Sequence, residues 1–295
     1  MVALLPRVKS RLFIHANRRT TNLLEGEYAA ISAGRSLDFD DLREYLPGDD
    51  VDDIDWNATA RTGNPLVKRY KQTRRHDVVL AVDTGRGMAA AAQTGAPKRD
   101  IAVLIAGALG YLSLRHGDAV GLMTQSGGRM RHRKPRASEA YLETLLRTVQ
   151  QETRLDSDPS DPYGLCGHLL RGIPNRSIVI IVGDDVEPAP DVDEALRALR
   201  EKHELMWITV GDLDLVKGDG SGRDLLDVED GGPIPAVLRK DPALAKVYAT
   251  RTSHRIAAQE AYFRSRGVSH CRVTGADEVV PALLRLLQRR RRAGF

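Results

Sequence analysis

The chain has 295 residues, of which 42% are hydrophobic and 28% are charged, values that are typical of a globular protein and exclude global disorder. The formal net charge is only +4, so charge by itself does not indicate a polyanionic partner. The length allows one large α/β domain, or one domain with a smaller appendage.

Residues 1–76 are predicted to form an N-terminal helical and signature segment. Residues 1–33 are predicted to be helical, because Leu4, Val8 and Leu12 recur at a roughly helical spacing. Residues 34–76 are rich in turn signals and end in a short alternating strand at 66–70.

From residue 77 the pattern changes to strands that alternate with helices, which predicts a mostly parallel sheet covered on both faces. The predicted strands are 78–82, 120–124, a basic edge ribbon at 130–135, 177–182, 205–210 and 270–273. The predicted helices are 99–115, 138–151 with Ser138 as its cap, 164–171, 191–203, 243–266 and 277–291. Residues 211–235 are predicted to be a flexible or inserted loop. We therefore predict a doubly wound α/β domain at 77–290 and a tail at 291–295.

The cysteine content and the apolar stretches predict a cytoplasmic protein without membrane contact. Cys166 and Cys271 are the only cysteines, and their spacing fits neither a metal knuckle nor a redox pair. The longest apolar stretch, 101–114, is shorter than a membrane-spanning helix. The N-terminal residues lack the apolar core and the cleavage site of a signal peptide.

Residues 34–61 carry three kinds of structural signal. Pro47-Gly48 predicts a type II turn, and Asp49 is predicted to cap a short helical turn. Trp56 is predicted to be a large anchor in the core. Three more residues are predicted to form a buried salt-bridge set that holds this segment on the sheet: Arg43, Asp55 and Arg61.

Ten residues of this segment match one family signature: Arg43, Tyr45, Pro47, Gly48, Asp49, Ile54, Asp55, Trp56, Ala60 and Arg61. The chain resembles the domain of unknown function fifty-eight family, in which this signature precedes a von Willebrand factor A-like (vWA) domain. Residues 117–122 and 178–185 are similar to two strand elements of that domain. The resemblance implies a vWA-like, Rossmann-like sheet with the signature segment packed on it.

A vWA-like domain implies a divalent metal at the carboxyl edge of its sheet, held by an Asp-x-Ser-x-Ser motif, a threonine and a later aspartate. In this chain Asp83 and Asp184 match the two aspartates, whereas Gly85 and Gly87 stand where the serines are expected. Magnesium accepts carboxylates and water. The resemblance therefore implies a degenerate metal-ion-dependent adhesion site, with no cofactor or with weakly bound magnesium. The alternative is that Asp83 only caps the following turn.

Arg86 lies between the two glycines, and we predict that its guanidinium takes the electrostatic place of the missing cation and meets a partner's carboxylate. The alternative is an exposed arginine without a role. The predicted partner-binding edge consists of Asp83, Thr84, Arg86, Ser126 and Asp184.

The resemblance also implies a partner, because members of this family often accompany MoxR-type AAA+ ATPases. We therefore expect a non-enzymatic adaptor or co-chaperone of such an ATPase. The alternative is a metal-dependent ligand-binding or nucleic-acid-binding protein.

Other chemistries have weaker support in the sequence. Residues 85–90 fit a relaxed dinucleotide fingerprint, but a single match of this kind is weak evidence. The sequence has no P-loop, no nucleophile elbow and no visible nucleophile–base pair, so it predicts no enzyme. Nucleic-acid binding is disfavoured because the basic ribbon lacks interleaved aromatic residues. That ribbon consists of Arg129, Arg131, His132, Arg133, Lys134 and Arg136.

Overall fold

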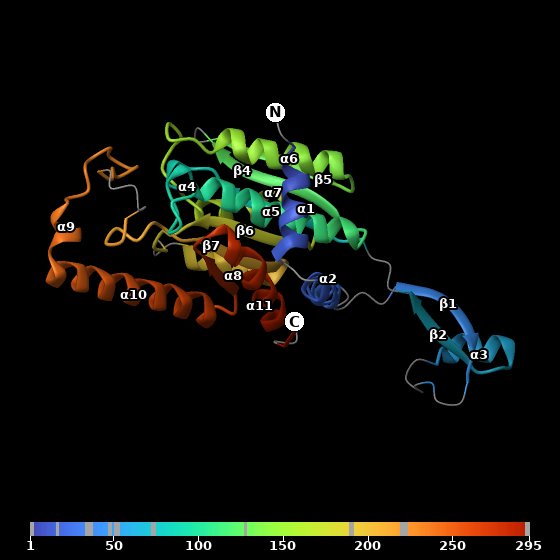
Figure 1. The fold of residues 1–295 in the computed structure, drawn as a ribbon. Helices are drawn as coiled ribbons and strands as arrows, with labels where there is room; N and C mark the ends of the chain where they lie inside the picture. Colours follow the sequence, from blue (N-terminus) through green and yellow to red (C-terminus); the bar gives the residue numbers. More distant parts are fainter. Residues whose placement is uncertain are drawn as a thin grey trace.

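The computed structural model describes residues 3–15, 18–32, 38–46, 49, 54–71, 75–126, 129–188, 192–218 and 224–292. The main sheet has six strands in the order β5-β4-β3-β6-β7-β8 (Figure 1). The strands are β3 (Asp77–Asp83), β4 (Ala119–Ser126), β5 (Arg129–Arg136), β6 (Ile178–Asp184), β7 (Glu204–Val210) and β8 (Ser269–Val273). All pairs are parallel except β4 with β5. The predicted α/β sheet is confirmed, and its strand order is the one expected of a doubly wound, vWA-like fold.

Successive strand residues point to opposite faces, so each buried strand contributes to two cores. On β3, Val78, Leu80 and Val82 join the first core, whereas Val79 and Ala81 join the second. The first core is covered by α1 (Leu4–His15), α2 (Arg18–Ser32), α5 (Lys98–Arg115), α6 (Glu139–Glu152) and α11 (Val279–Arg292). The second core is covered by α7 (Gly164–Gly172), α8 (Val192–Lys202) and α10 (Pro242–Ser265).

The longest apolar stretch of the sequence forms α5, the central helix of the first core. Every residue from Ile101 to Ser113 is buried. A Cβ at Gly107 would lie 2.7 Å from Val8, and one at Gly110 would lie 2.7 Å from Leu142, so these glycines let α1 and α6 approach closely. Among the described helices, none has both the length and the apolar character that a membrane crossing requires.

The predicted N-terminal helical segment forms α1 and α2, and both helices pack on the main domain. Leu4, Val8 and Leu12 are buried, as their spacing predicts. The carboxylate of Glu143 accepts hydrogen bonds from the backbone N–H groups of Leu4 and Leu5, at 3.0 and 2.7 Å. It thereby satisfies two of the donors that a helix leaves open at its start.

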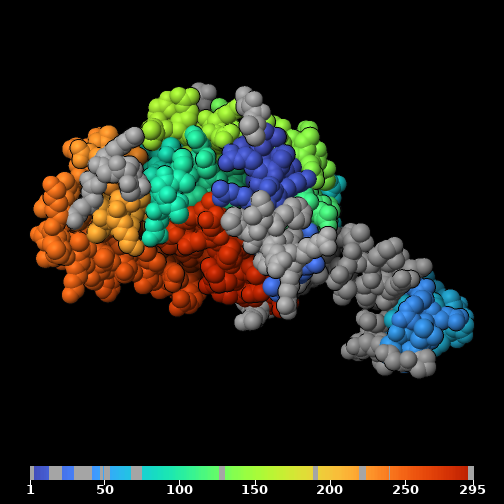
Figure 2. Space-filling model, viewed as in Figure 1, coloured from blue at the N-terminus to red at the C-terminus, as the bar shows by residue number. Residues whose placement is uncertain are grey.

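The signature segment forms a separate module, and the prediction that it packs on the sheet is wrong. Strands β1 (Asp38–Glu44) and β2 (Leu66–Lys71) pair antiparallel, and the short helix α3 (Trp56–Thr62) lies between them in the chain. The module extends away from the main sheet (Figure 1), as a blue lobe beside the body (Figure 2). Of its described side chains, Val67 is the one buried hydrophobic, whereas Leu46 is 60% exposed.

The charged signature residues pair within the module. Arg43 donates two hydrogen bonds to the carboxylate of Asp49, at 2.8 and 2.6 Å, a bidentate arrangement. The helical turn that Asp49 is predicted to cap would lie at 50–53, outside the described residues. Asp55 caps α3, because its carboxylate accepts from the N–H groups of Asn57 and Ala58. Of the predicted salt-bridge set, Arg43 forms its described ion pair with Asp49.

Trp56 and Arg61 also differ from their predicted roles. Trp56 is 65% exposed, so it is not a core anchor. Arg61 is exposed in the last turn of α3. Tyr45 is half-buried, and its N–H donates to the carbonyl of Pro65 at 2.9 Å. The predicted turn at Pro47 and Gly48 lies outside the described residues.

The segment predicted to be an inserted loop connects β7 to α10. Its described part makes isolated bridges from Asp212 to Ala92 and from Leu226 to Pro233, followed by the short helix α9 (Val237–Lys240). Helix α10 has 24 residues, of which only Gln259 and Phe263 are buried. The N-terminal part of α10 and the insertion project beyond the sheet (Figure 1).

Candidate functional site

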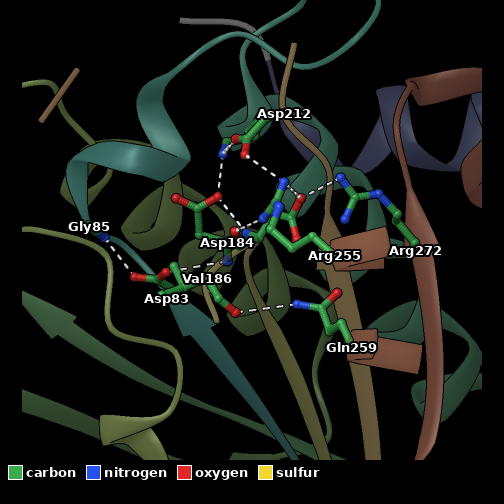
Figure 3. A network of polar contacts seen from close by, with 10 residues as sticks. Asp83, Gly85, Asp184, Val186, Asp212, Arg255, Gln259 and Arg272 are labelled. Atoms are coloured by element: carbon green, nitrogen blue, oxygen red, sulfur yellow. Dashed lines mark hydrogen bonds and ion pairs between the residues drawn. The ribbon is translucent and has the colours of Figure 1, made fainter. Parts of the chain in front are cut away.

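The carboxyl ends of β3 and β6 bring Asp83 and Asp184 together. The two strands are neighbours, and the chain continues from β3 toward one edge of the sheet and from β6 toward the other. Ligands of open α/β sheets bind at this kind of switch point. Asp83 Oδ2 accepts a hydrogen bond of 3.4 Å from the backbone N–H of Asp184 (Figure 3). The sequence therefore predicted the correct location for both aspartates.

A lysine that the sequence analysis missed provides the cation of this site. Lys98 is the first residue of α5, and its side chain is 1% exposed. Its ammonium group donates to Asp184 Oδ1 and, at 2.5 Å, to Asp212 Oδ1. Burial acts to lower the pKa of Lys98, but the two carboxylates outweigh it and hold the pKa above its ordinary value. Lys98 is therefore charged at neutral pH.

Gly87 has a specific steric role at this site. A Cβ built at Gly87 would lie 1.8 Å from Asp184 Oδ2 and 2.8 Å from Ser160 Oγ. The carboxylate of Asp184 therefore occupies the space that the side chain of a serine at position 87 would need. The glycine at position 87 is therefore what allows Asp184 to take its present position.

Gly85 is tightly packed for a similar reason. A Cβ at Gly85 would lie 2.4 Å from the Cα of Ser160, so the backbone of the loop before α7 fills the space of the other expected serine. The resemblance implies that a threonine ligand of the metal comes from the loop that contains Ser160. In the structure this loop packs against Gly85 and Gly87, so it does lie at the site.

These residues do not fit a magnesium site. Magnesium needs several oxygen ligands in near-octahedral geometry. Here an ammonium group lies between the carboxylates of Asp184 and Asp212, and two glycines replace the serine oxygens. Among the described residues, no group of three or more His, Cys, Asp or Glu side chains is arranged to hold a metal ion.

Asp83 is buried below this ion pair. Its Oδ1 accepts from the N–H of Gly85 at 2.9 Å, so it does close the turn after β3. Burial raises the pKa of Asp83 to about 7, the backbone N–H of Gly85 opposes this shift, and the nearby Asp184 adds to it. Near neutral pH this carboxyl group therefore exchanges a proton, and the charge of the site changes with it.

The other predicted partner-binding residues have different positions. Thr84 is buried, and its hydroxyl donates to the backbone carbonyl of Gln125, so it is already used in the fold. Ser126 is the last residue of β4, and its side chain lies outside the described part of the chain. Arg86 Nη1 donates to the carbonyl of Glu229 at 3.1 Å, and Arg86 Nε lies 3.7 Å from its carboxylate. The cation that bonds to Asp184 is Lys98, so the predicted electrostatic role of Arg86 is corrected.

A second ion-pair cluster braces the same edge. The carboxylate of Asp185 accepts from Arg255 at 2.7 Å and from Arg272 at 2.5 Å, which ties the loop after β6 to α10 and β8 (Figure 3). Burial acts to raise the pKa of Asp185, but the two guanidinium groups outweigh it and hold the pKa below its ordinary value.

A cleft of about 590 Å³ opens above Lys98 and Asp184, between the sheet edge and the insertion. Its walls are largely apolar and come from the insertion and α10. They include Leu213, Leu215, Leu225, Leu226, Val228, Ile234 and Tyr248. Among the described residues of its lining, the exposed charged ones are acidic: Glu187, Asp212, Asp227 and Glu229. The cleft therefore combines apolar walls with an acidic rim.

Restoring the serine at position 87 is expected to disturb the site. The G87S side chain collides with Asp184 and must displace it from Lys98, so the free energy of unfolding should fall by about 1–3 kcal/mol or more. Urea denaturation measures this change. The matched control is G26S, because a Cβ at Gly26 meets no atom within 4 Å and should change stability by less than about 0.5 kcal/mol. If G87S is as stable as G26S, the close packing of Gly87 on Asp184 is wrong.

Comparison with known families agrees with the signature residues. The sequence profile described as "protein of unknown function DUF58" matches residues 41–253, which cover more than half of the chain. The chain belongs to the DUF58 family. Similar curated proteins include uncharacterized protein Mb1516 of Mycobacterium bovis and uncharacterized protein Rv1480 of Mycobacterium tuberculosis. Each is 29% identical over 252 residues, covering 81% of this chain and 74% of the relative.

Two solved structures of Bacteroides proteins are also similar. One is an aerotolerance-related membrane protein from Bacteroides fragilis with multiple mutations to serines; it has 15% identity and a TM-score of 0.42 and covers 72% of this DUF58 chain and 99% of its own. The other is the conserved hypothetical protein BatB from Bacteroides thetaiotaomicron. It also has 15% identity, with a TM-score of 0.43, and covers 72% of this chain and 98% of its own.

Proposed function

We propose that this DUF58 protein is a non-enzymatic interaction module that binds a protein partner at the carboxyl edge of its sheet, without a metal ion. The observation that carries the proposal is the ammonium group of Lys98 between Asp184 and Asp212. The two carboxylates hold the pKa of Lys98 above its ordinary value, so the edge keeps a cation at this position without magnesium. The apolar cleft next to it offers a partner surface to bury.

The partner in this proposal is a MoxR-type AAA+ ATPase, for which the protein acts as an adaptor or co-chaperone. This choice rests on the resemblance to a family whose members often accompany such ATPases. The state of the two cysteines supports a role without catalysis by a cysteine nucleophile. Burial raises the pKa of both Cys166 and Cys271 to about 12, so both thiols stay protonated and unreactive.

The experiment is to purify the tagged protein from its native lysate with magnesium or with EDTA and to identify co-eluting proteins by mass spectrometry. We expect an AAA+ ATPase in equal amounts in both samples. Recovery only with magnesium would contradict the metal-independent mode and favour the alternative of a metal-dependent binding protein. No ATPase in either sample would contradict the adaptor role.

A cleft variant should separate specific binding from background. Leu226 is 64% exposed and lines the cleft, so L226E should lower the recovered ATPase about tenfold by placing a charge on the contact surface. Leu155 is 66% exposed and lies outside this cleft, so L155E is the matched control and should recover as much as the wild type. Equal losses in both variants would contradict binding at the cleft.

A further inference from the structure

Strand β8 forms one edge of the main sheet. It pairs with β7 on one side, and no other strand of the described chain pairs with it. An edge strand presents backbone N–H and C=O groups that an extended chain can bind. Natural proteins often cover such an edge with a helix or loop, or place charged side chains on it. The residues around β8 therefore show whether its edge is open to a partner.

A groove of about 480 Å³ follows this edge. Its floor is the segment 267–272, which includes most of β8. Its sides are the last turns of α10, with Glu260 and Arg264, and the middle of α11, with Arg285 and Arg289. The two helices cover opposite faces of the sheet, so the groove opens outward between them. This groove is separate from the cleft above Lys98.

The groove is strongly basic. Arg264, Arg285 and Arg289 are exposed, and none of them forms an ion pair with a described residue. Glu260 is the one acidic residue among the described residues of the lining. Arg285 and Arg289 are four positions apart on α11, a spacing at which like charges destabilise a helix. The chain has a net charge of only +4, so this clustering is local.

The titration of His270, which also lines the groove, agrees with a positive local potential. Burial, with smaller contributions from Arg272 and Arg289, lowers the pKa of His270 to about 4. The ring is already engaged, because it stacks on Phe263 at 4.5 Å and its Nε2 lies 3.0 Å from the hydroxyl of Thr209. It is therefore not offered to a nucleic-acid base, and no other described residue of the lining has a ring for stacking.

We propose that this groove binds an extended acidic segment of a protein, which adds a strand to the free edge of β8. Main-chain hydrogen bonds to β8 hold the segment, as in other cases of strand addition. Successive side chains of the added strand point to opposite faces of the sheet. Carboxylates at alternate positions therefore share one face, where they meet Arg285 and Arg289 of α11, because guanidinium groups bind carboxylates well. The residues between them face Arg264 of α10. This site is independent of the function proposed for the carboxyl edge.

Short fluorescein-labelled peptides test the proposal by fluorescence anisotropy with the full chain. The probe alternates valine and glutamate, and the matched peptide has glutamine in place of glutamate. At low salt we expect the glutamate peptide to bind at least about tenfold more tightly. The variant R285Q/R289Q should lose most of this difference. The control R115Q/R171Q, which changes two exposed arginines outside the groove, should keep it.

A third peptide tests the main-chain part of the proposal. It carries N-methyl groups at alternate residues, which removes backbone donors while keeping the glutamates, and it should bind several-fold more weakly. Circular dichroism checks that each variant is folded. Equal affinity for the glutamate and glutamine peptides, or no effect of R285Q/R289Q or of N-methylation, would overturn the proposal. Tighter, Arg-dependent binding of single-stranded oligothymidine would overturn it in favour of a nucleic acid.

Discussion

Replacing Lys98 by methionine is expected to lower the free energy of unfolding by about 3–5 kcal/mol, because it leaves the buried carboxylate of Asp184 without its cation. Methionine is close to lysine in length, so it fills most of the space of this buried side chain. The loss is therefore electrostatic rather than a loss of packing. Urea denaturation at neutral pH measures it.

Two further variants separate this pair from ordinary surface charge. In K98M/D184N both charges are absent, so most of the lost stability should return. In K217M the lysine is 75% exposed and lies 3.7 Å from Asp214, so the cost should be below about 1 kcal/mol. If K98M is no less stable than K217M, Lys98 does not hold the buried carboxylate.

The second large effect concerns Asp83 and appears as a dependence on pH. Its pKa is raised from 3.8 to about 7 in the folded protein, chiefly by burial. Between these values the folded state keeps a proton that the unfolded state has released. Stability therefore falls as pH rises through this range, and the Asp83 contribution levels off above about pH 7.

The size of this effect follows from the shift. Each pKa unit corresponds to about 1.4 kcal/mol, so a shift of about three units removes about 4 kcal/mol of stability between pH 4 and pH 8. In D83N this contribution is absent, while the amide oxygen can still accept from the N–H of Gly85. We therefore expect D83N to gain about 4 kcal/mol relative to the wild type on going from pH 4 to pH 8.

Urea denaturation of both proteins at several pH values gives this difference, and the other titrating groups cancel in the comparison. The control is D156N, because Asp156 is 70% exposed and its pKa is lowered by Arg154, so its contribution has the opposite sign. A wild-type profile that runs parallel to that of D83N would contradict the raised pKa of Asp83.

The main sheet and the position of its carboxyl edge could be predicted from the sequence because both depend on local pattern. Buried parallel strands appear as continuous apolar runs, such as 78–82 and 178–182. Asp83 directly follows the first run, and Asp184 follows the second after Gly183, so the pattern predicts that both lie at the carboxyl edge of the sheet.

The partner of Asp184 could not be found in the same way, because Lys98 stands at the start of a helix, 86 positions earlier in the chain. A lysine there is usually an exposed residue. One signal was available: Val-Gly-Asp occurs at 182–184 and again at 210–212, at the ends of neighbouring strands β6 and β7. This repeat predicts that Asp212 lies beside Asp184. Two carboxylates at such a short distance repel each other, so a cation is expected between them.

The signature segment was misjudged for a related reason. The prediction assumed that a tryptophan and a set of opposite charges indicate a buried contact with the sheet. In the structure Arg43 and Asp49 are six positions apart and pair with each other, and Trp56 begins an exposed helix. Residue types alone do not distinguish a contact within a module from one between modules.

The close packing of Gly87 on Asp184 makes the residues at these two positions depend on each other. A serine at position 87 and the present orientation of Asp184 exclude each other, because a Cβ at position 87 would lie 1.8 Å from Asp184 Oδ2. A relative with serine at position 87 must therefore hold the aspartate that corresponds to Asp184 in a different orientation.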